Sequence, residues 1–87
     1  MFKPNPKAQV LNKFKELFGT DHDVTVVGGR LTPAQCRSHG FPTDTFMTEL
    51  HCGDEVVAAA HSRDWRHAYK LLRLEVEKLF TDGTQFA

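Results

Sequence analysis

The hydrophobic positions of the chain follow a helical spacing at both ends and a strand spacing in the middle. Near the N-terminus, apolar side chains recur at steps of three and four residues, at Val10, Leu11, Phe14, Leu17 and Phe18. This spacing is typical of an amphipathic helix. Asn5 and Pro6 predict where the helix begins, and Gly19 predicts where it ends.

The middle of the chain has the alternation and turn residues of antiparallel strands. Residues 23–29, DVTVVGG, are rich in β-branched side chains and predict a strand that ends in a glycine turn. Residues 46–51 alternate as a second strand, Gly53-Asp54 predicts a hairpin turn, and Val56-Val57 begins the return strand. Between the first two strands, Thr32-Pro33 and Gly40 can enclose one or two helical turns.

A second long helix is predicted from Asp64, its N-cap, to Asp82-Gly83. On a helical wheel one stripe is apolar and a second is basic. The apolar stripe contains Ala68, Leu72, Val76 and Leu79. The basic stripe contains Arg63, Arg66, Lys70 and Arg73.

This order of elements predicts an α+β fold of two layers, αβββα. A three-stranded antiparallel sheet has one face to cover, and two helices on that face bury both apolar stripes. At 87 residues the chain fits one small domain, spanning 1–87. We expect an ordered core over residues 6–80 and a frayed tail over 81–87.

Charge and composition narrow the function classes. Eleven Lys and Arg balance eleven Asp and Glu, so no overall charge draws the chain to nucleic acid or to a membrane. The cations gather toward the two ends of the chain. Two cysteines are too few for a disulfide framework, and we find no signal peptide or membrane-spanning run. We therefore expect an intracellular protein, cytoplasmic or nuclear, with free thiols and no membrane partner.

A metal site and a catalytic site both have weak support in the sequence. Cys36-x-x-His39 together with His51-Cys52 has some of the spacing of a zinc site. Adjacent strand residues point to opposite faces, however, so His51 and Cys52 would rarely bind one ion. Nothing in the pattern supplies a nucleophile with an orienting base, so we expect no enzyme, metal, cofactor or small-molecule substrate.

In the order of its elements and in particular residues, the chain resembles the double-stranded RNA-binding domain. From Phe46 onward the family's strand start, glycine turn and small residues before a basic helix start align without a gap. The matching residues are Phe46, Glu49, Gly53, Glu55, Val57, Ala58 and Ala68. The sequence NP followed by VLNKF is similar to the opening of the family's first helix. The resemblance implies shape-dependent contacts to A-form RNA from both helices and a loop.

The chain departs from the family at the positions that contact RNA. Lys13 stands where the first helix usually has Glu, and the long loop lacks Gly-Pro-x-His. The family's Lys-Lys-x-Ala-Lys helix start is filled here by Trp65, Arg66, His67, Ala68 and Tyr69. Two of the three lysine positions are therefore aromatic, while Arg63, Lys70 and Arg73 carry positive charge on an adjacent face.

The leading hypothesis is a binding module that recognises structured or double-stranded RNA by shape. The candidate nucleic-acid contacts are Lys7, Lys13, Arg37, His39, Arg63, Arg66, His67, Lys70 and Arg73. The alternative is a fold of the same kind that binds a protein partner or forms a homodimer without RNA. Its candidate surfaces are Trp65 with Tyr69, which the wheel also allows at the core edge, and the exposed edge of the third strand.

Overall fold

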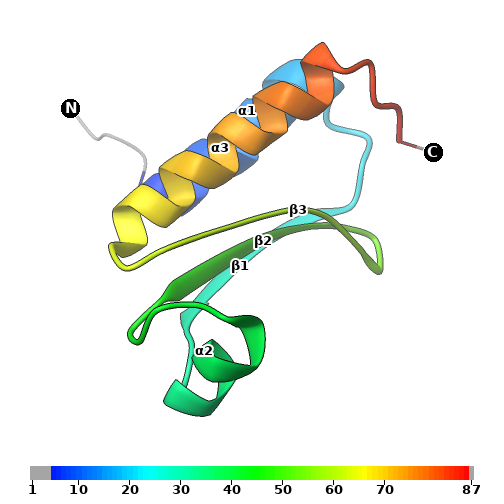
Figure 1. Cartoon of the computed structure of the whole chain (residues 1–87). Coiled ribbons are helices and arrows are strands. Elements are labelled where there is room, and N and C mark those ends of the chain that lie inside the picture. Colours follow the sequence, from blue (N-terminus) through cyan, green and yellow to red (C-terminus); the bar gives the residue numbers. More distant parts are fainter. Residues whose placement is uncertain (1–4, 87) are drawn as a thin grey trace.

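The computed structural model describes residues 5–86 and has the α+β architecture that the sequence predicts (Figure 1). Its elements are α1 (Pro6–Phe18), β1 (Val24–Arg30), α2 (Pro33–His39), β2 (Phe46–Cys52), β3 (Glu55–Ser62) and α3 (Trp65–Thr81). The predicted two-layer fold is confirmed, with a short additional helix between β1 and β2.

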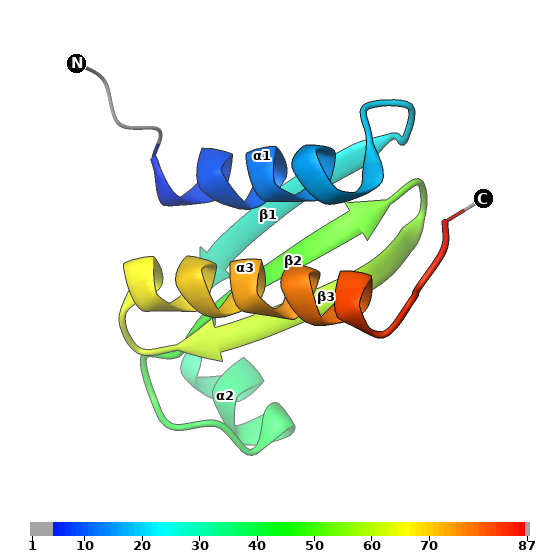
Figure 2. The ribbon, with the colours of Figure 1, turned by 90° about the horizontal axis from the view of Figure 1, so that it is seen from above.

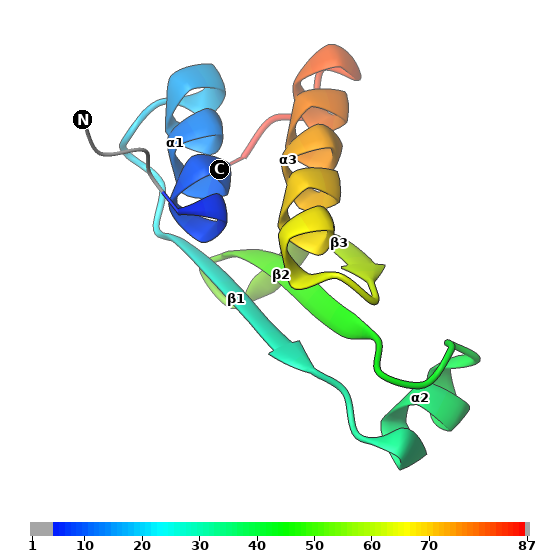
Figure 3. The same ribbon diagram turned by 90° about the vertical axis from the view of Figure 1, so that its left-hand side faces the viewer.

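The sheet is antiparallel in the order β1-β2-β3, so β1 and β3 are its two edge strands. Val26 pairs with Leu50, and Leu50 pairs with Ala58 on its other side. The long helices α1 and α3 pack side by side over one face (Figures 2 and 3). The short helix α2 lies at one end of the sheet, away from α1 and α3 (Figure 3). One sheet face therefore has no helical layer within residues 5–86.

Both long helices begin at the capping residues that the sequence predicts. The N–H of Ala8 donates to Asn5 Oδ1 over 2.7 Å, and the N–H of Arg66 donates to Asp64 Oδ1 over 3.0 Å. These bonds satisfy donors that have no partner inside the helix. Gly19 ends α1 with a φ of 90°, a conformation that favours glycine. The local sequence therefore determines where both helices start.

The loop helix α2 also has both of its ends specified locally. Thr32 and Gln35 form a reciprocal capping box at its start, and Gly40 ends it in a left-handed conformation. Cys36 is the buried residue of this helix. The helical turns expected between Thr32 and Gly40 are thus confirmed.

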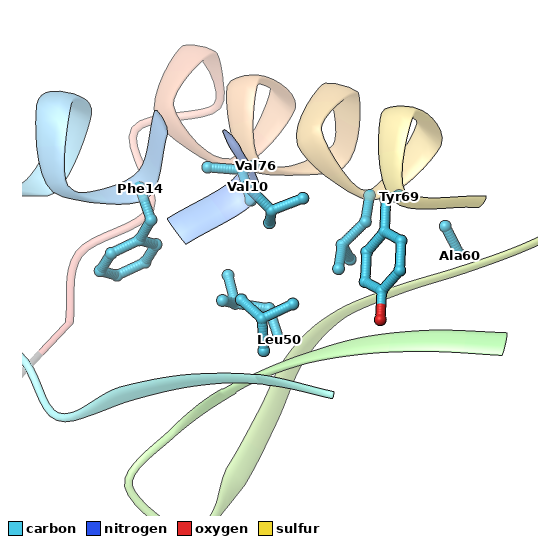
Figure 4. Packing of buried hydrophobic residues seen from close by; sticks show 8 residues of the cluster. Val10, Phe14, Leu50, Ala60, Tyr69 and Val76 are labelled. Carbon is cyan, nitrogen blue, oxygen red and sulfur yellow. The ribbon is translucent and has the colours of Figure 1, made fainter. Parts of the chain in front are cut away.

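The core lies between the two long helices and the sheet (Figure 4). Its buried members are Val10, Phe14, Val26, Leu50, Ala60, Tyr69, Leu72 and Val76. The hydroxyl of Thr48, which is fully buried, donates to the carbonyls of Ala60 and Ala68 over 3.1 and 3.3 Å. That hydroxyl therefore connects β2 to β3 and to the first turn of α3.

Two features differ from the expectations. Gly28 and Gly29 continue β1 to Arg30 and form no turn. The Tyr69 ring lies against the bare backbone of Gly28, so a small residue there serves packing and not chain reversal.

Residues 81–86 are also not a frayed tail throughout. Thr81 belongs to α3, and the Phe86 ring lies 5.4 Å from that of Phe14.

We predict that Gly28→Ala destabilises the protein, because an added Cβ would lie 2.8 Å from Tyr69 Cζ and 2.9 Å from Phe46 Cε1. Relieving such overpacking should cost about 1–3 kcal/mol of the free energy of unfolding, measured by urea denaturation. Gly29→Ala is the matched control, since a Cβ there meets no atom within 4 Å. Equal stabilities of the two variants would contradict the proposed role of Gly28.

Candidate nucleic-acid interface

A hollow of about 180 Å³ lies between the first turns of α1 and α3. Its lining consists of Pro6, Gln9, Arg66, Tyr69, Lys70 and Arg73. We call it the cationic hollow, because three of these residues carry positive charge and none is acidic. The parallel packing of α1 and α3 brings these residues together from opposite ends of the sequence (Figure 2).

The three cations of the hollow share one face of α3 because they are spaced by three and four residues. Arg66 and Lys70 are exposed, and Arg73 is half-buried. Arg73 Nη1 donates to Gln9 Oε1 over 3.1 Å, which ties the guanidinium to α1. None of the three forms an ion pair with a carboxylate of residues 5–86. Their charge is therefore available to an anionic ligand.

The two candidate lysines of α1 lie apart from the cationic hollow. Lys13 Nζ is 3.2 Å from Glu16 Oε2 and 3.8 Å from Glu77 Oε1. Its charge is therefore compensated within the fold, and it joins α1 to α3. Lys7 is exposed on a different flank of α1, beside Val24 and the edge of β1. These positions do not add to the charge of the hollow.

Arg63 braces the loop that precedes β2. Its Nε donates to the carbonyl of Thr43 over 3.2 Å, and Arg30 Nη1 donates to the carbonyls of Arg63 and Asp44. The guanidinium of Arg30 also lies 5.6 Å from the centre of the Phe46 ring. Sequence reasoning missed Arg30, because a single cation at the end of a strand has no periodic signal.

The candidate loop residues Arg37 and His39 are exposed on α2. The His39 ring stacks on Phe41 with a centroid distance of 5.4 Å, and Phe41 stacks on His61 at 4.0 Å. This row of rings holds the loop against β3. His67 is exposed at the start of α3 but does not line the cationic hollow.

Trp65 and Tyr69 have different environments. Tyr69 is 6% exposed and belongs to the core, whereas Trp65 is 39% exposed. Figure 4 shows the Tyr69 ring pointing from α3 toward the sheet. Of the two aromatic residues suggested for protein contacts, only Trp65 therefore presents a surface. The predicted position of Tyr69 at the core edge underestimated its burial. A helical wheel describes α3 alone and contains no information about the space that Gly28 leaves on β1.

Burial raises the pKa of the Tyr69 phenol above its ordinary value of 10.0, since the charged phenolate is poorly solvated there. A raised pKa in the folded state stabilises the fold below the unfolded pKa and loses that stabilisation as the pH rises through the folded value. We therefore predict a fall in melting temperature in alkaline solution above about pH 10.

The measurement is direct because Tyr69 is the only tyrosine of the chain. Tyrosinate absorbance followed against pH reports its ionisation, and thermal unfolding at the same pH values reports stability. In Tyr69→Phe the alkaline fall should be smaller, since the ionising group is gone. An ordinary titration of Tyr69 in the folded protein would contradict the burial seen here.

The cysteines give no sign of a metal centre in the described part of the chain. Cys36 is buried and Cys52 is half-buried, and both are free. Within residues 5–86, no three His, Cys, Asp or Glu side chains are grouped closely enough to hold an ion. No helix in the same range has the length and apolar composition to cross a membrane.

Comparisons with known proteins do not suggest a function, so a proposal must be based on the fold and the geometry of the site. No protein-family model matches the chain, and no curated protein or solved structure is detectably similar to it. What is established is a protein class defined by architecture, a small two-layer α+β domain whose two long helices frame a cationic hollow. The resemblance to double-stranded RNA-binding domains stays a prediction.

Proposed function

We propose that the protein binds structured RNA, with the cationic hollow as its main contact to phosphates. The observation that carries the proposal is the convergence of Arg66, Lys70 and Arg73 on a recess with no acidic lining. The recess also lies beside the first turn of α1, where the positive end of the helix dipole favours an anion.

The arrangement suits a ligand that is recognised by shape. A-form RNA presents regularly spaced phosphates and wide minor grooves, and proteins read it largely through the backbone. In this chain the N-terminal ends of two parallel helices flank one recess, so both can face the same duplex. A rigid pair of helices supports a fixed spacing of contacts better than a flexible basic tail.

The net charge of zero predicts weak attraction at a distance. Binding then depends on the few cations that touch the RNA, and it should weaken steeply as salt is added. We expect little dependence on base sequence, because phosphate contacts carry no sequence information directly.

The first test is the double charge reversal Arg66→Glu with Lys70→Glu, assayed with an RNA duplex of at least about 16 base pairs at low and moderate salt. We expect binding to be lost, because two of the three cations of the hollow become anions. Replacing Arg66 and Lys70 by Gln should lower the salt slope by about two units.

The matched control reverses Lys15 and Lys78, two exposed cations that do not line the hollow. This control changes the net charge equally, so a general electrostatic effect would weaken both variants alike. Circular dichroism checks that all variants fold. Absence of duplex binding by the unmodified protein at low salt, or unchanged binding by the hollow variant, would refute the proposal.

Self-association through β3 is the second candidate function, supported by the character of that edge. Its outer side is unpaired within residues 5–86, and its sequence, EVVAAAHS, has no lysine or proline to block pairing. A bulge between Leu50 and His51 distorts the Glu55 end, which opposes pairing and ranks this candidate second.

Sedimentation at increasing protein concentration tests this second candidate. It predicts a dimer that Ala59→Lys converts to a monomer, since a lysine on an edge strand hinders strand addition. Thr25→Lys is the matched control, because Thr25 is an exposed residue of the other edge strand. A protein that stays monomeric at high concentration would eliminate the homodimer.

A further inference from the structure

Trp65 lies at the first position of α3, immediately beside a residue that lines the cationic hollow. It is the only tryptophan in the chain, and 39% of its surface is exposed. The Arg66 guanidinium lies 5.2 Å from the centre of the Trp65 ring. An aromatic surface and a free cation are therefore adjacent at the rim of the hollow.

The indole is held in place from beneath. Its ring meets that of Tyr69 at 6.3 Å in an edge arrangement with an interplanar angle of 85°. Tyr69 is itself fixed by burial and lies 5.7 Å from the ring of Phe46. The Arg66 guanidinium lies over part of the indole, and the exposed remainder of a Trp side chain supported in this way is available at little further cost in conformational entropy.

Cations stand at both ends of this row of rings. Arg66 lies at the Trp65 end, and Arg30 lies over Phe46 at the other end. The carboxylate of Asp64, the residue before Trp65, accepts the N–H of Arg66 as a helix cap and keeps its negative charge, which the adjacent positive charge of Arg66 opposes. A ligand that rests on Trp65 is thus favoured if it combines a flat ring with negative charge.

We propose that Trp65 stacks on an unpaired base that adjoins the RNA duplex whose phosphates occupy the cationic hollow. The inference rests on the proposed RNA binding and makes its substrate class more specific: a duplex with an adjoining unpaired base. A base has a π face that stacks on any aromatic side chain, and the backbone on either side of it supplies phosphates for Arg66 and Lys70. Trp65 then distinguishes a duplex with an adjoining unpaired base from a fully paired duplex.

A protein partner would use some of the same features, since exposed Trp and Arg residues are frequent at interface hot spots. The RNA base is favoured here because the indole adjoins a recess with three cations and no acidic lining. A protein surface would need several carboxylates to match that charge, whereas a nucleotide carries both components in one unit.

The experiment compares two RNA duplexes at low salt, one blunt and one identical except for a short single-stranded extension. We expect the extended duplex to bind about tenfold more tightly, as one base stacked on an aromatic side chain would give. It should also quench the fluorescence of Trp65, while the blunt duplex leaves that fluorescence nearly unchanged.

Substitution at Trp65 connects this preference to the residue. Trp65→Ala should bind both duplexes equally, and Trp65→Phe should keep part of the preference because a smaller ring remains. Phe80→Ala is the matched control, since Phe80 is an aromatic residue of α3 that is 51% exposed and far along the helix from the hollow. The control should keep the full preference, and Trp65→Phe serves if the alanine variant does not fold.

The outcomes separate the inference from the proposed function. Equal binding of the two duplexes with unchanged Trp65 fluorescence overturns the inference and leaves RNA binding intact. Failure to bind either duplex overturns both. A Trp65→Ala variant that alters sedimentation of the protein but not its preference between the RNAs also overturns the inference, and assigns Trp65 to a protein contact.

Discussion

The approach of Tyr69 to Gly28 is the contact on which the placement of α3 over the sheet depends. The phenol ring descends from the first turns of the helix onto a strand position that has no side chain. A strand residue with a Cβ would push the ring away, and the N-terminal half of α3 would move with it. Packing at atomic density makes such a displacement costly, so Gly28 and Tyr69 must be compatible as a pair.

The same contact has consequences on the adjacent surface of α3. Arg66, Lys70 and Arg73 are spaced by four and three residues and share a face that borders Tyr69 and Leu72. With those two residues buried, this bordering face lies beside α1. Gln9 then receives the guanidinium of Arg73, while the Lys13–Glu77 pair joins the helices farther along. The cationic hollow is therefore a product of core packing as much as of surface charge.

Aromatic residues divide into two roles at this end of the molecule. Tyr69 contributes its ring to the core. Trp65 keeps an exposed ring but rests on Tyr69, so the buried residue orients the exposed one. The cations of α3 lie on neighbouring positions of the same turns, so this end of the helix combines an exposed aromatic ring with positive charge.

The local sequence was sufficient to predict the helices and strands. It did not predict which of them contact one another through particular side chains. Asn5, Thr32 and Asp64 marked the helix starts, because a capping side chain acts within three residues. The alternating pattern of β2 identified the hairpin for a similarly local reason. The sequence also placed Arg66, Lys70 and Arg73 on one face of a helix, since that follows from helical periodicity alone.

Only the tertiary structure decided which of these residues act together. In the folded protein, Glu77 compensates the charge of Lys13. Arg63 and Arg30 form hydrogen bonds that hold a loop in place. The ring of Phe86 packs against that of Phe14. Each of these interactions joins segments that are far apart in the chain, so their distances depend on how the layers pack. The amino-acid sequence by itself thus determined the αβββα order and a basic helix face, whereas the hollow, the burial of Tyr69 and the exposure of Trp65 required the packing of α1 and α3 on the sheet.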